Sequence, residues 1–592
     1  MKPRTTLLLA TIACGIFAYI WFVERHTEST RESADSNARV LALEANDITA
    51  ITIQNGDNKL ELQKGEGVWK ITHPLADRAD SALIQTLLTS LESLRHSSKI
   101  EISPSQEKEK FKEFGVAESD LHLKLKSDSG KTTELLLGKD SAIDGKIYVR
   151  QQGSNTVYVI NSSLRTYLSK KNDDFRDTKL SDIPSQHIQR MSVKTQEGEL
   201  ELERKNNHWE IVKPLRARAA DQKVNDLIAG VLNAKVSQFY SETPTPEQGL
   251  GEPRALITLN IEGQKSPVTL KVGTTPTGEA NKEKSFTRLS DRPAVTVLAN
   301  SALDPLLKAR PNDVRDRKLV RVENDIIDRI TIEANGQPKL VMTRKGEGWV
   351  QKDNGTEIKI NESIPAKILT TVQATNVTNF ITDIASDLAQ YGLEKPKLKL
   401  TFSSYASENT AETKAGDRPI ASVLFGNTEG DSSYVKLEDE PFVVAAPRAF
   451  GESLPTHRIH LQPLSVASFK IEDITSIEVT KAGSSIKLDR KENKWKSTDA
   501  TCVINEANVA SLLTNLSNLK TNRWQTPQEA GEQSTDSPEL ALNLTLKDGS
   551  SVTIQVIRPL GEEGFISKIS TSAGFFLLSK KQYALLDLNL ID

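Results

Sequence analysis

The chain has 592 residues, a formal net charge of −3 and a charged content of 26%, which is ordinary for a globular protein. A charge so close to neutral, without a cluster of Lys and Arg among aromatic residues, gives no reason to expect a nucleic acid as partner. The two cysteines, Cys14 and Cys502, lie far apart in the sequence, which excludes a disulfide framework and a zinc site built from several cysteines.

The N-terminus carries the first predicted element, a transmembrane helix. Residues 5–23 form an uncharged apolar stretch of 19 residues, preceded by Lys2 and Arg4. A helix of that length spans about 28 Å, close to the thickness of the hydrocarbon core. Positive charge before the stretch predicts that residues 1–4 form a cytoplasmic tip. We therefore expect a single-pass anchor in the inner (cytoplasmic) membrane, a polar stalk over residues 24–46, and the rest of the chain on the extracytoplasmic side.

Two other interpretations of the N-terminus stay open. A cleaved signal peptide has a shorter apolar core that ends at small residues, whereas this stretch ends in Trp21-Phe22-Val23. A lipoprotein signal is suggested by Ala13-Cys14-Gly15, although the apolar run continues past the cysteine. Both alternatives also place residues 24–592 outside the cytoplasm.

The remainder of the chain is organised around a recurring tryptophan. Trp69, Trp209, Trp349 and Trp495 each follow an apolar-alternating run with basic residues, and they are separated by 209 − 69 = 140, 349 − 209 = 140 and 495 − 349 = 146 residues. Spacing this regular indicates tandem repeats. We predict four copies of one small domain, at residues 47–180, 181–319, 320–462 and 463–592.

The first copy shows which elements each repeat contains. Apolar residues alternate over 48–53, 60–62 and 68–71, with turn residues between the runs, which predicts a meander of three strands. Leu83, Leu87, Leu88 and Leu91 then share one face of a helix. Four more strands are predicted at 121–125, 135–137, 148–149 and 157–160, and a short helix at 162–168. Each repeat is thus an α+β domain, either one sheet with helices on one face or two packed layers.

Two residue types define the repeat signature. Asp80, Asp221, Asn361 and Asn505 precede the apolar face of each main helix, where a side-chain oxygen can accept from free N–H groups, so we predict them to be the helix caps. The four tryptophans are expected to be core residues, because a large ring at the end of a strand buries much apolar area. A ligand-stacking role for these rings is the alternative.

The connectors between the repeats also share a pattern. Residues 175–180 read Phe-Arg-Asp-Thr-Lys-Leu and residues 314–319 read Val-Arg-Asp-Arg-Lys-Leu, whereas the third connector, around His457-Arg458, keeps only the arginine. We expect the Arg176-Asp177 and Arg315-Asp316 pairs to tie each connector to an adjacent copy, with a binding pair as the alternative. The Gly-Val and Gly-Leu pairs at 115, 249 and 392 have no evident counterpart in the fourth copy.

Catalytic motifs are not found in the sequence. The spacings of a phosphate-binding P-loop, of H-E-x-x-H and of G-x-S-x-G are missing. His457 and His460 are the only closely spaced histidines, and a metal site there is disfavoured because no carboxylate lies at helical spacing. We therefore predict no enzyme activity, no cofactor and no metal.

The pattern as a whole resembles a known bacterial family. An N-terminal anchor is followed by I-x-I, L-x-L and W-x-I runs, then by an acidic residue with a Leu-Leu pair as at Asp80 and Leu87-Leu88, and later by Y-[VI]-[RK] as at Tyr148. This series is similar to the family called domain of unknown function 4340. The resemblance implies an extracytoplasmic accessory or scaffold subunit, encoded beside ABC transporters of the gliding-motility type, and it supplies no catalytic residue.

Three functions are compared on these grounds. The first is a membrane-anchored scaffold that docks an ABC-type permease, an auxiliary subunit or an envelope complex, since tandem domains offer extended surfaces. The second is an envelope glycan-binding module, which would need exposed aromatic residues, yet aromatic residues make up only 5% of the chain. The third is a hydrolase with a site assembled between copies. The scaffold is the function that the sequence favours.

Overall fold

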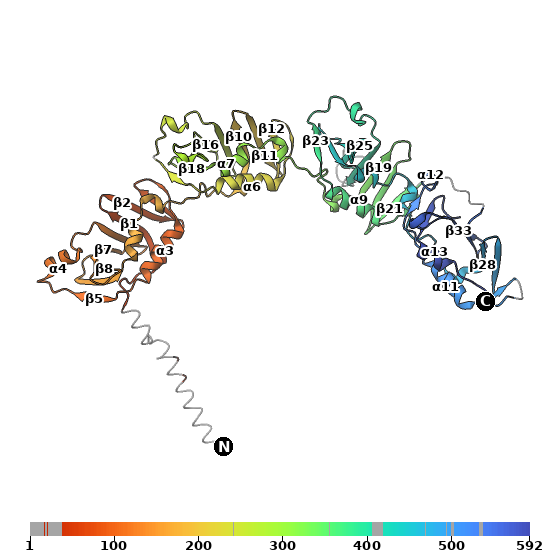
Figure 1. Ribbon diagram of the computed structural model, residues 1–592, viewed down its shortest axis with the longest axis horizontal. Helices are drawn as coiled ribbons and strands as arrows, with labels where there is room; N and C mark the ends of the chain where they lie inside the picture. Colours follow the sequence, from red (N-terminus) through yellow and green to blue (C-terminus); the bar gives the residue numbers. More distant parts are fainter. Residues whose placement is uncertain are drawn as a thin grey trace, which may run out of the picture. The chain divides into compact units, whose positions relative to one another are not determined.

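Four antiparallel sheets make up the part of the chain that the structure describes. This computed structural model describes Phe17, Trp21 and residues 38–240, 242–353, 356–404, 418–467, 469–492, 494–498, 502–531 and 537–592. The chain divides into two compact units, Met1–Arg315 and Asp316–Asp592, and each unit contains two sheets (Figure 1). The fold is α+β, with four sheet domains.

The predicted anchor at residues 5–23 lies outside the described residues, except for Phe17 and Trp21. No helix among the described residues is both long enough and apolar enough to span a bilayer.

The first sheet joins the two predicted meanders into one layer. Its strand order is β4-β3-β2-β1-β6-β7-β8-β9-β5, and the two meanders meet where Ile51 of β1 pairs with Leu125 of β6. This single nine-stranded sheet answers the question that the sequence left open. Its elements are β1 (Ile48–Asn55), β2 (Asn58–Gly65), β3 (Val68–His73), β4 (Asp77–Arg78), α3 (Ser81–Glu92), β5 (Ser98–Glu101), α4 (Glu107–Phe114), β6 (Leu121–Ser127), β7 (Thr132–Asp140), β8 (Lys146–Gln151), β9 (Thr156–Asn161) and α5 (Ser163–Leu168).

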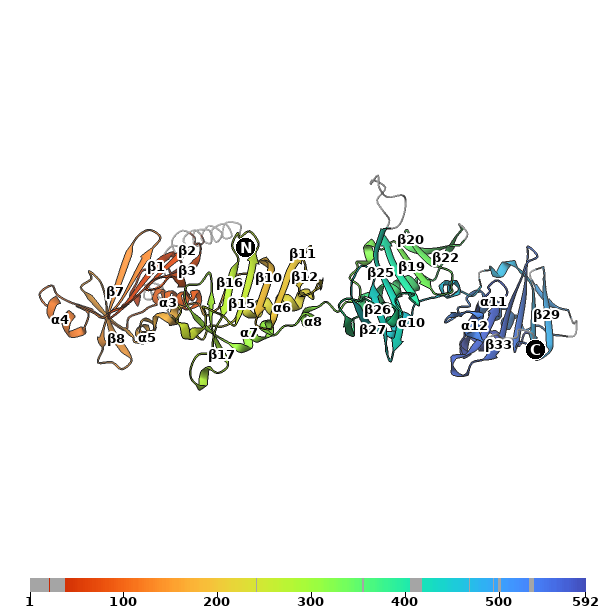
Figure 2. The same cartoon turned by 90° about the horizontal axis from the view of Figure 1, so that it is seen from above.

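The second sheet repeats this order strand for strand. Figures 1 and 2 show its two helices α6 and α7 side by side along the sheet. Its elements are β10 (Ile188–Thr195), β11 (Gly198–Lys205), β12 (His208–Lys213), β13 (Ala217–Arg218), α6 (Asp221–Leu232), β14 (Gln238–Phe239), β15 (Ala255–Ile261), β16 (Val268–Val272), β17 (Lys284–Leu289), β18 (Thr296–Ala299) and α7 (Asn300–Leu307); the short helix α8 (Pro311–Val314) follows.

The second unit contains the third and fourth sheets. The third has β19 (Arg329–Ala334), β20 (Leu340–Lys345), β21 (Gly348–Asp353), β22 (Thr356–Lys359), α9 (Ser363–Ala374), β23 (Asn379–Thr382), β24 (Leu398–Ser404), β25 (Arg418–Glu429), β26 (Ser432–Leu437), β27 (Val443–Pro447) and α10 (Arg448–Glu452). The fourth, with eight strands among the described residues, has β28 (Ile474–Lys481), β29 (Ser484–Lys491), β30 (Lys494–Ser497), α11 (Glu506–Ser517), β31 (Trp524–Gln525), α12 (Pro527–Ala530), β32 (Leu540–Leu546), β33 (Ser551–Pro559), β34 (Phe565–Ile569), β35 (Phe575–Leu578) and α13 (Lys580–Leu586).

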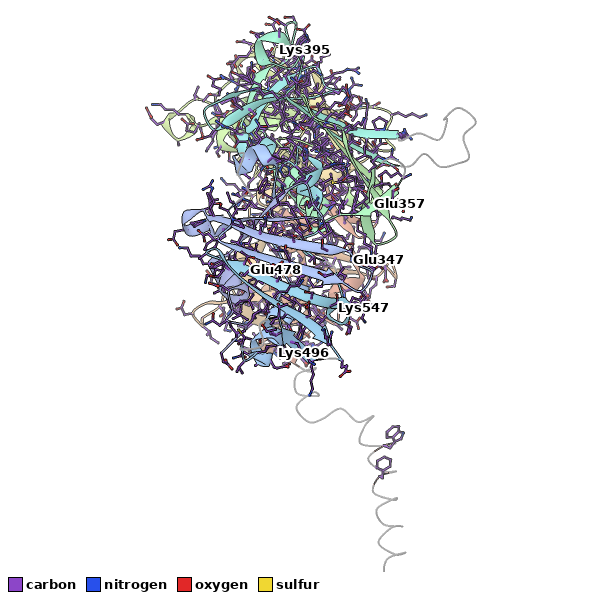
Figure 3. The ribbon with its side chains drawn as sticks, turned by 90° about the vertical axis from the view of Figure 1, so that its right-hand side faces the viewer. Glu347, Glu357, Lys395, Glu478, Lys496 and Lys547 are labelled. Carbon is purple, nitrogen blue, oxygen red and sulfur yellow. The ribbon has the colours of Figure 1, made fainter. Side chains whose placement is uncertain are left out.

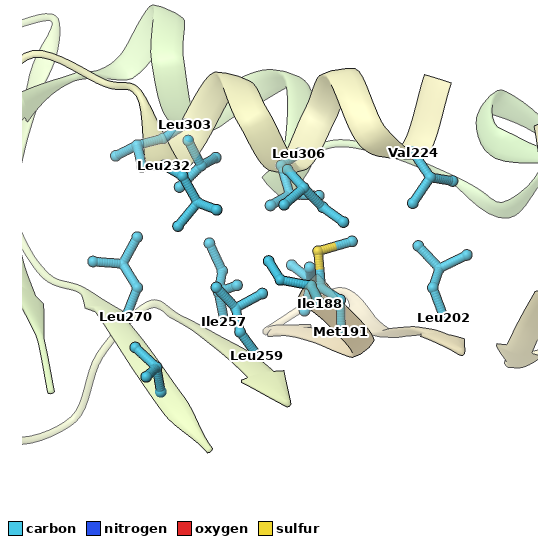
Figure 4. Close-up of a cluster of buried hydrophobic side chains, with 14 of the residues drawn as sticks. Ile188, Met191, Leu202, Val224, Leu232, Ile257, Leu259, Leu270, Leu303 and Leu306 are labelled. Carbon is cyan, nitrogen blue, oxygen red and sulfur yellow. The ribbon is translucent and has the colours of Figure 1, made fainter. Parts of the chain in front are cut away.

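Each core lies between one face of a sheet and its helices. In the second repeat, Met191 and Leu202 on the strands meet Val224 on α6 and Leu306 on α7, and all four side chains are buried (Figure 4). Because side chains alternate along a strand, the other face carries the polar residues. Figure 3 shows the fourth sheet, with Glu478 on β28 and Lys496 on β30 labelled.

The predicted helix caps hold at two of the four positions. Asp80 accepts from Leu83 N at 2.9 Å, and Asn505 accepts from Asn508 N at 3.0 Å. The prediction was wrong for Asp221, which is the first residue of α6 after the cap residue Ala220 and instead accepts from Trp209 N at 2.6 Å. At α9 the cap position belongs to Glu362, whose side chain makes no capping bond, and Asn361 Oδ1 accepts from Ser363 N, the first N–H of the helix, at 3.2 Å.

A close glycine contact recurs on the other face of three sheets. A Cβ added to Gly138 of β7 would clash with the carbonyl oxygen of Phe114, just before Gly115 ends α4 in the left-handed conformation. Gly273 and Gly426 are crowded in the same way. In the fourth repeat, Gly531 ends α12 in the same left-handed conformation, with a φ of 76°, although Glu532 follows it in the sequence and not Val or Leu.

Candidate functional site: the junctions between neighbouring repeats

The connector between the first two repeats pairs with both of them. Arg176 forms an antiparallel bridge with Ala79 of the first repeat, and Lys179 forms one with Lys235 of the second. The backbone bonds confirm this pairing, since Asp80 N donates to Phe175 O at 2.8 Å and Val236 N donates to Thr178 O at 2.7 Å. A connector that is bonded to two domains within four residues leaves little freedom for a hinge.

A buried ion cluster fills the same junction. Asp77 on β4 accepts from Arg176 at 2.6 Å and from Arg292, in the loop after β17, at 3.1 Å. The side chains of Asp77, Arg176 and Arg292 are only 2%, 6% and 3% exposed. Arg292 also donates to the carbonyl oxygens of Lys179 at 2.9 Å and of Asp177 at 2.6 Å. Burial lowers the pKa of Arg292, and the nearby Asp77 carboxylate acts in the opposite direction.

An aromatic ring and an outer ion pair complete this cluster. The guanidinium carbons of Arg176 and Arg292 lie 4.2 Å and 4.9 Å from the centre of the Phe239 ring on β14, within cation–π distance. Arg78 faces Asp177 at 3.3 Å. The prediction that Arg176 and Asp177 tie the connector to an adjacent copy is therefore confirmed. Sequence reasoning missed Asp77, Arg292 and Phe239, for which the repeat pattern gave no signal.

The second unit has the same backbone junction with different side chains. Asn361 N donates to Leu461 O at 2.9 Å, and Ser465 forms a bridge with Lys520. Gln462 therefore takes the place of Arg176, so the prediction that Arg458 is the matching residue was wrong. Leu461 and Val466 are apolar, like the first and sixth residues of the segment 175–180. This pattern would have aligned the third connector correctly.

The counterparts of Asp77 and Arg292 at the second junction are also uncharged. Ile358 has the register of Asp77, because Gln351 pairs with Ile358 as Ile71 pairs with Asp77. Ser572 is the counterpart of Arg292. Phe576 pairs with Ser567 as Thr296 pairs with Thr287. Ser572 stands four residues before Phe576, and Arg292 stands four residues before Thr296. Ser572 Oγ donates to Gln462 Oε1 at 3.1 Å, whereas Ile358 stays 45% exposed. Isoleucine, glutamine and serine thus replace the buried ions.

This second junction contains a groove. A cavity of about 830 Å³ is bounded by α9, by the segment after α10, by His460 and Leu464 of the connector and by the residues around β31 of the fourth repeat. His460 Nε2 and Glu529 Oε2 are 2.9 Å apart at its rim. Burial alone would raise the pKa of the Glu529 carboxyl, but the hydrogen bonds from His460 and from Thr526 N outweigh it and lower that pKa.

The two histidines of the connector act as hydrogen-bond acceptors for the backbone. Ile459 N donates to His457 Nδ1 at 3.2 Å, and His457 N donates to His460 Nδ1 at 3.4 Å. Burial, together with the neighbouring His460 and Arg458, lowers the pKa of His457. Within the part of the chain that the structure describes, no three His, Cys, Asp or Glu side chains form a group that could hold a metal ion.

None of the four signature tryptophans lines this groove. Trp69, Trp209 and Trp349 are 3%, 0% and 8% exposed, and Trp495 packs partly buried against the fourth core. An arginine lies over three of the rings, at 4.9 Å for Arg204 on Trp209, 5.0 Å for Arg344 on Trp349 and 5.8 Å for Arg490 on Trp495. The tryptophan that does line the groove is Trp524, at a position which the repeat pattern did not indicate.

The fold and its junctions define a tandem α+β repeat protein. The family model described as Domain of unknown function (DUF4340) matches residues 69–253, 209–383 and 351–539, which together span most of the chain. The chain therefore belongs to this family. The first two matches begin at Trp69 and Trp209, so the family model repeats along the chain with the same period as the tryptophans. A search of curated proteins finds no match.

Proposed function

We propose that this protein is a membrane-anchored scaffold on the extracytoplasmic side of the inner membrane, which docks an ABC-type permease or an auxiliary subunit of such a transporter. The anchor is the apolar stretch at residues 5–23 with Lys2 and Arg4 before it. The partner class follows from what the family resemblance implies.

The observation that carries this proposal is the double attachment of the connector. In the first unit, Arg176 is bridged to one repeat and Lys179 to the next, and Asp77 with Arg292 joins the two by buried charges. Two domains held in this way present their polar sheet faces at a fixed spacing. Fixed spacing is what lets several weak contacts act together on one large partner.

The experiment that tests the proposal is photo-crosslinking in native membranes. A photoreactive residue replaces Glu478 or Lys126, both of which lie on polar sheet faces, in the full-length protein. We expect one adduct with an integral membrane protein of the transporter class. The matched control carries a cleavable signal peptide instead of residues 5–23, and the adduct should be lost when the chain is no longer held at the membrane.

Two results would contradict the proposal. One is the lack of any adduct with a membrane-embedded protein at both positions. The other is an adduct with cell-wall glycan that persists in the released chain, which would favour the glycan-binding module.

A further inference from the structure

The groove between the third and fourth repeats has the features of a binding site. Its walls include Ile364 on α9, Leu464 in the connector, Asn522 just before the edge strand β31, and Gln525 in that strand. A cavity of about 830 Å³ falls within the size range of ligand sites in proteins. The walls come from two repeats, so a ligand here would contact both of them.

One wall residue has an unused hydrogen-bond acceptor. Gln525 is 7% exposed, and among the described residues no group donates to its Oε1. A buried acceptor without a donor costs roughly 1–3 kcal/mol. Gln525 is one of the residues that line the groove, and its terminal amide can turn about a soft torsion. The site therefore favours a ligand that carries an N–H or O–H donor.

The charges and apolar side chains narrow the ligand class further. Lys367 and Arg523 are balanced by Glu452 and Glu529, so the groove has no excess of either sign. A polyanion would find no complementary field there. Leu464 is 36% exposed and Ile364 is half-buried, which leaves apolar surface for an uncharged side chain of the ligand.

Peptide fits this wall better than sugar does. Sugars commonly stack on an open aromatic face, but Trp524 is only 6% exposed, packs against Phe576 and donates its Nε1–H to Pro463 O at 2.8 Å. An extended peptide supplies both backbone N–H donors for Gln525 and apolar side chains for Leu464 and Ile364.

We infer that the groove binds an extended, largely uncharged peptide segment of a partner protein, with a peptide N–H on Gln525 and an apolar side chain on Leu464. This inference rests on the proposed function, because it names the chemistry by which the scaffold holds its partner. The first junction does not offer the same groups, because Thr178 and Tyr240 stand there at the positions of Leu464 and Gln525.

The test uses the full-length protein in lipid nanodiscs and a phage library of random dodecapeptides. Enriched peptides are synthesised, and their affinities are measured for the unmodified protein and for Leu464→Glu and Gln525→Leu. The matched control is Leu585→Glu, because Leu585 is also an exposed leucine (44%) but lies on α13. We expect each groove variant to bind about tenfold or more weakly and the control to bind within about twofold of the unmodified protein.

Hydrogen exchange separates lost binding from lost folding. Bound peptide should slow exchange in residues 361–371 and 522–529, and the unbound variants should exchange like the unmodified protein. The inference is overturned if no peptide is enriched, if the enriched peptides bind Leu464→Glu equally well, or if cell-wall glycan fragments compete for the groove. Peptide binding with no membrane adduct would contradict the scaffold function alone, whereas an adduct that persists in Leu464→Glu would contradict the groove alone.

Discussion

Asp77 and Arg292 are 215 residues apart in the chain, yet their side chains meet at 3.1 Å inside the first junction, where both are nearly inaccessible to solvent. The pair links an edge strand of one repeat to a loop of the next. A buried carboxylate held by two guanidinium groups is costly to break, since the remaining charges cannot reach water. This relationship makes the first unit a pair of repeats rather than two independent domains.

Asp77→Asn should destabilise the first unit, because it leaves Arg176 and Arg292 buried without their shared carboxylate. The expected loss is about 3–5 kcal/mol in the free energy of opening at this junction. Hydrogen exchange of β4 and β14, followed by mass spectrometry, measures it. Glu61→Gln is the control, because the Lys59–Glu61 pair is exposed and should contribute less than about 1 kcal/mol. Equal effects of the two substitutions would refute the role of the cluster.

Replacing the whole ion cluster should cost less than removing one member. The triple variant Asp77→Ile, Arg176→Gln and Arg292→Ser carries the residues found at the second junction, and it leaves no unpaired buried charge. We expect the triple variant to be at least about 1 kcal/mol more stable than Asp77→Asn alone. The reason is that the effects of substitutions within one buried network on the free energy of unfolding are not additive. Urea titration of the two variants compares them. A triple variant that is less stable than Asp77→Asn would contradict this expectation, since Ile, Gln and Ser would then not replace the ion cluster at the first junction.

Gly138→Ala should destabilise the first repeat locally. The added methyl group would clash with Phe114 O. This oxygen is a backbone atom at the end of α4, so neither α4 nor β7 can move away easily. A cost of about 1–3 kcal/mol is expected for overpacking of this kind. Gly65→Ala is the matched control, because a Cβ at Gly65 meets nothing within 4 Å. The measurements are thermal unfolding of both variants and hydrogen exchange in α4. Equal stability and equal exchange in the two variants would exclude the close contact.

Acid should loosen the second junction in two stages. The pKa of His457 is lowered by burial, so the stability contributed by its neutral ring is complete above the unfolded value of about 6.5 and is lost as the pH falls below it. The pKa of Glu529 is also lowered, so its contribution is complete above about 4.5 and is lost in more acid solution.

Hydrogen exchange in residues 458–461 between pH 7.5 and pH 4 measures this loss. His457→Asn keeps a side-chain acceptor for Ile459 N but cannot titrate, so it should remove the first stage and leave the second. His187→Asn, at an exposed histidine of the other unit, serves as control. The same pH profile in all three proteins would exclude His457 as the group responsible.

Sequence periodicity could predict the strands and main helices because each has a face that is buried along its whole length. The caps Asp80 and Asn505 followed from the same pattern, whereas at Asp221 the residue in the cap position is Ala220, and the aspartate binds Trp209 N instead. The two-residue strand β4 is too short to show a period.

The junctions could not be predicted in this way, because their contacts join residues of different repeats. Asp77 has Ala217 and Ile358 at the equivalent strand positions, so comparison of the copies gives no signal for its partner Arg292. The groove is also a product of two repeats, and its wall residue Gln525 belongs to a strand of only two residues.

A spin-label distance measurement can show whether neighbouring repeats are held at a fixed spacing. Labels are placed on cysteines that replace the exposed residues Ser129 and Ser301 of the first unit, in full-length protein whose Cys14 and Cys502 are changed to serine. We expect one narrow distance distribution, which broadens in Arg292→Ser. A broad distribution in the unmodified protein, or one that Arg292→Ser leaves unchanged, would contradict it.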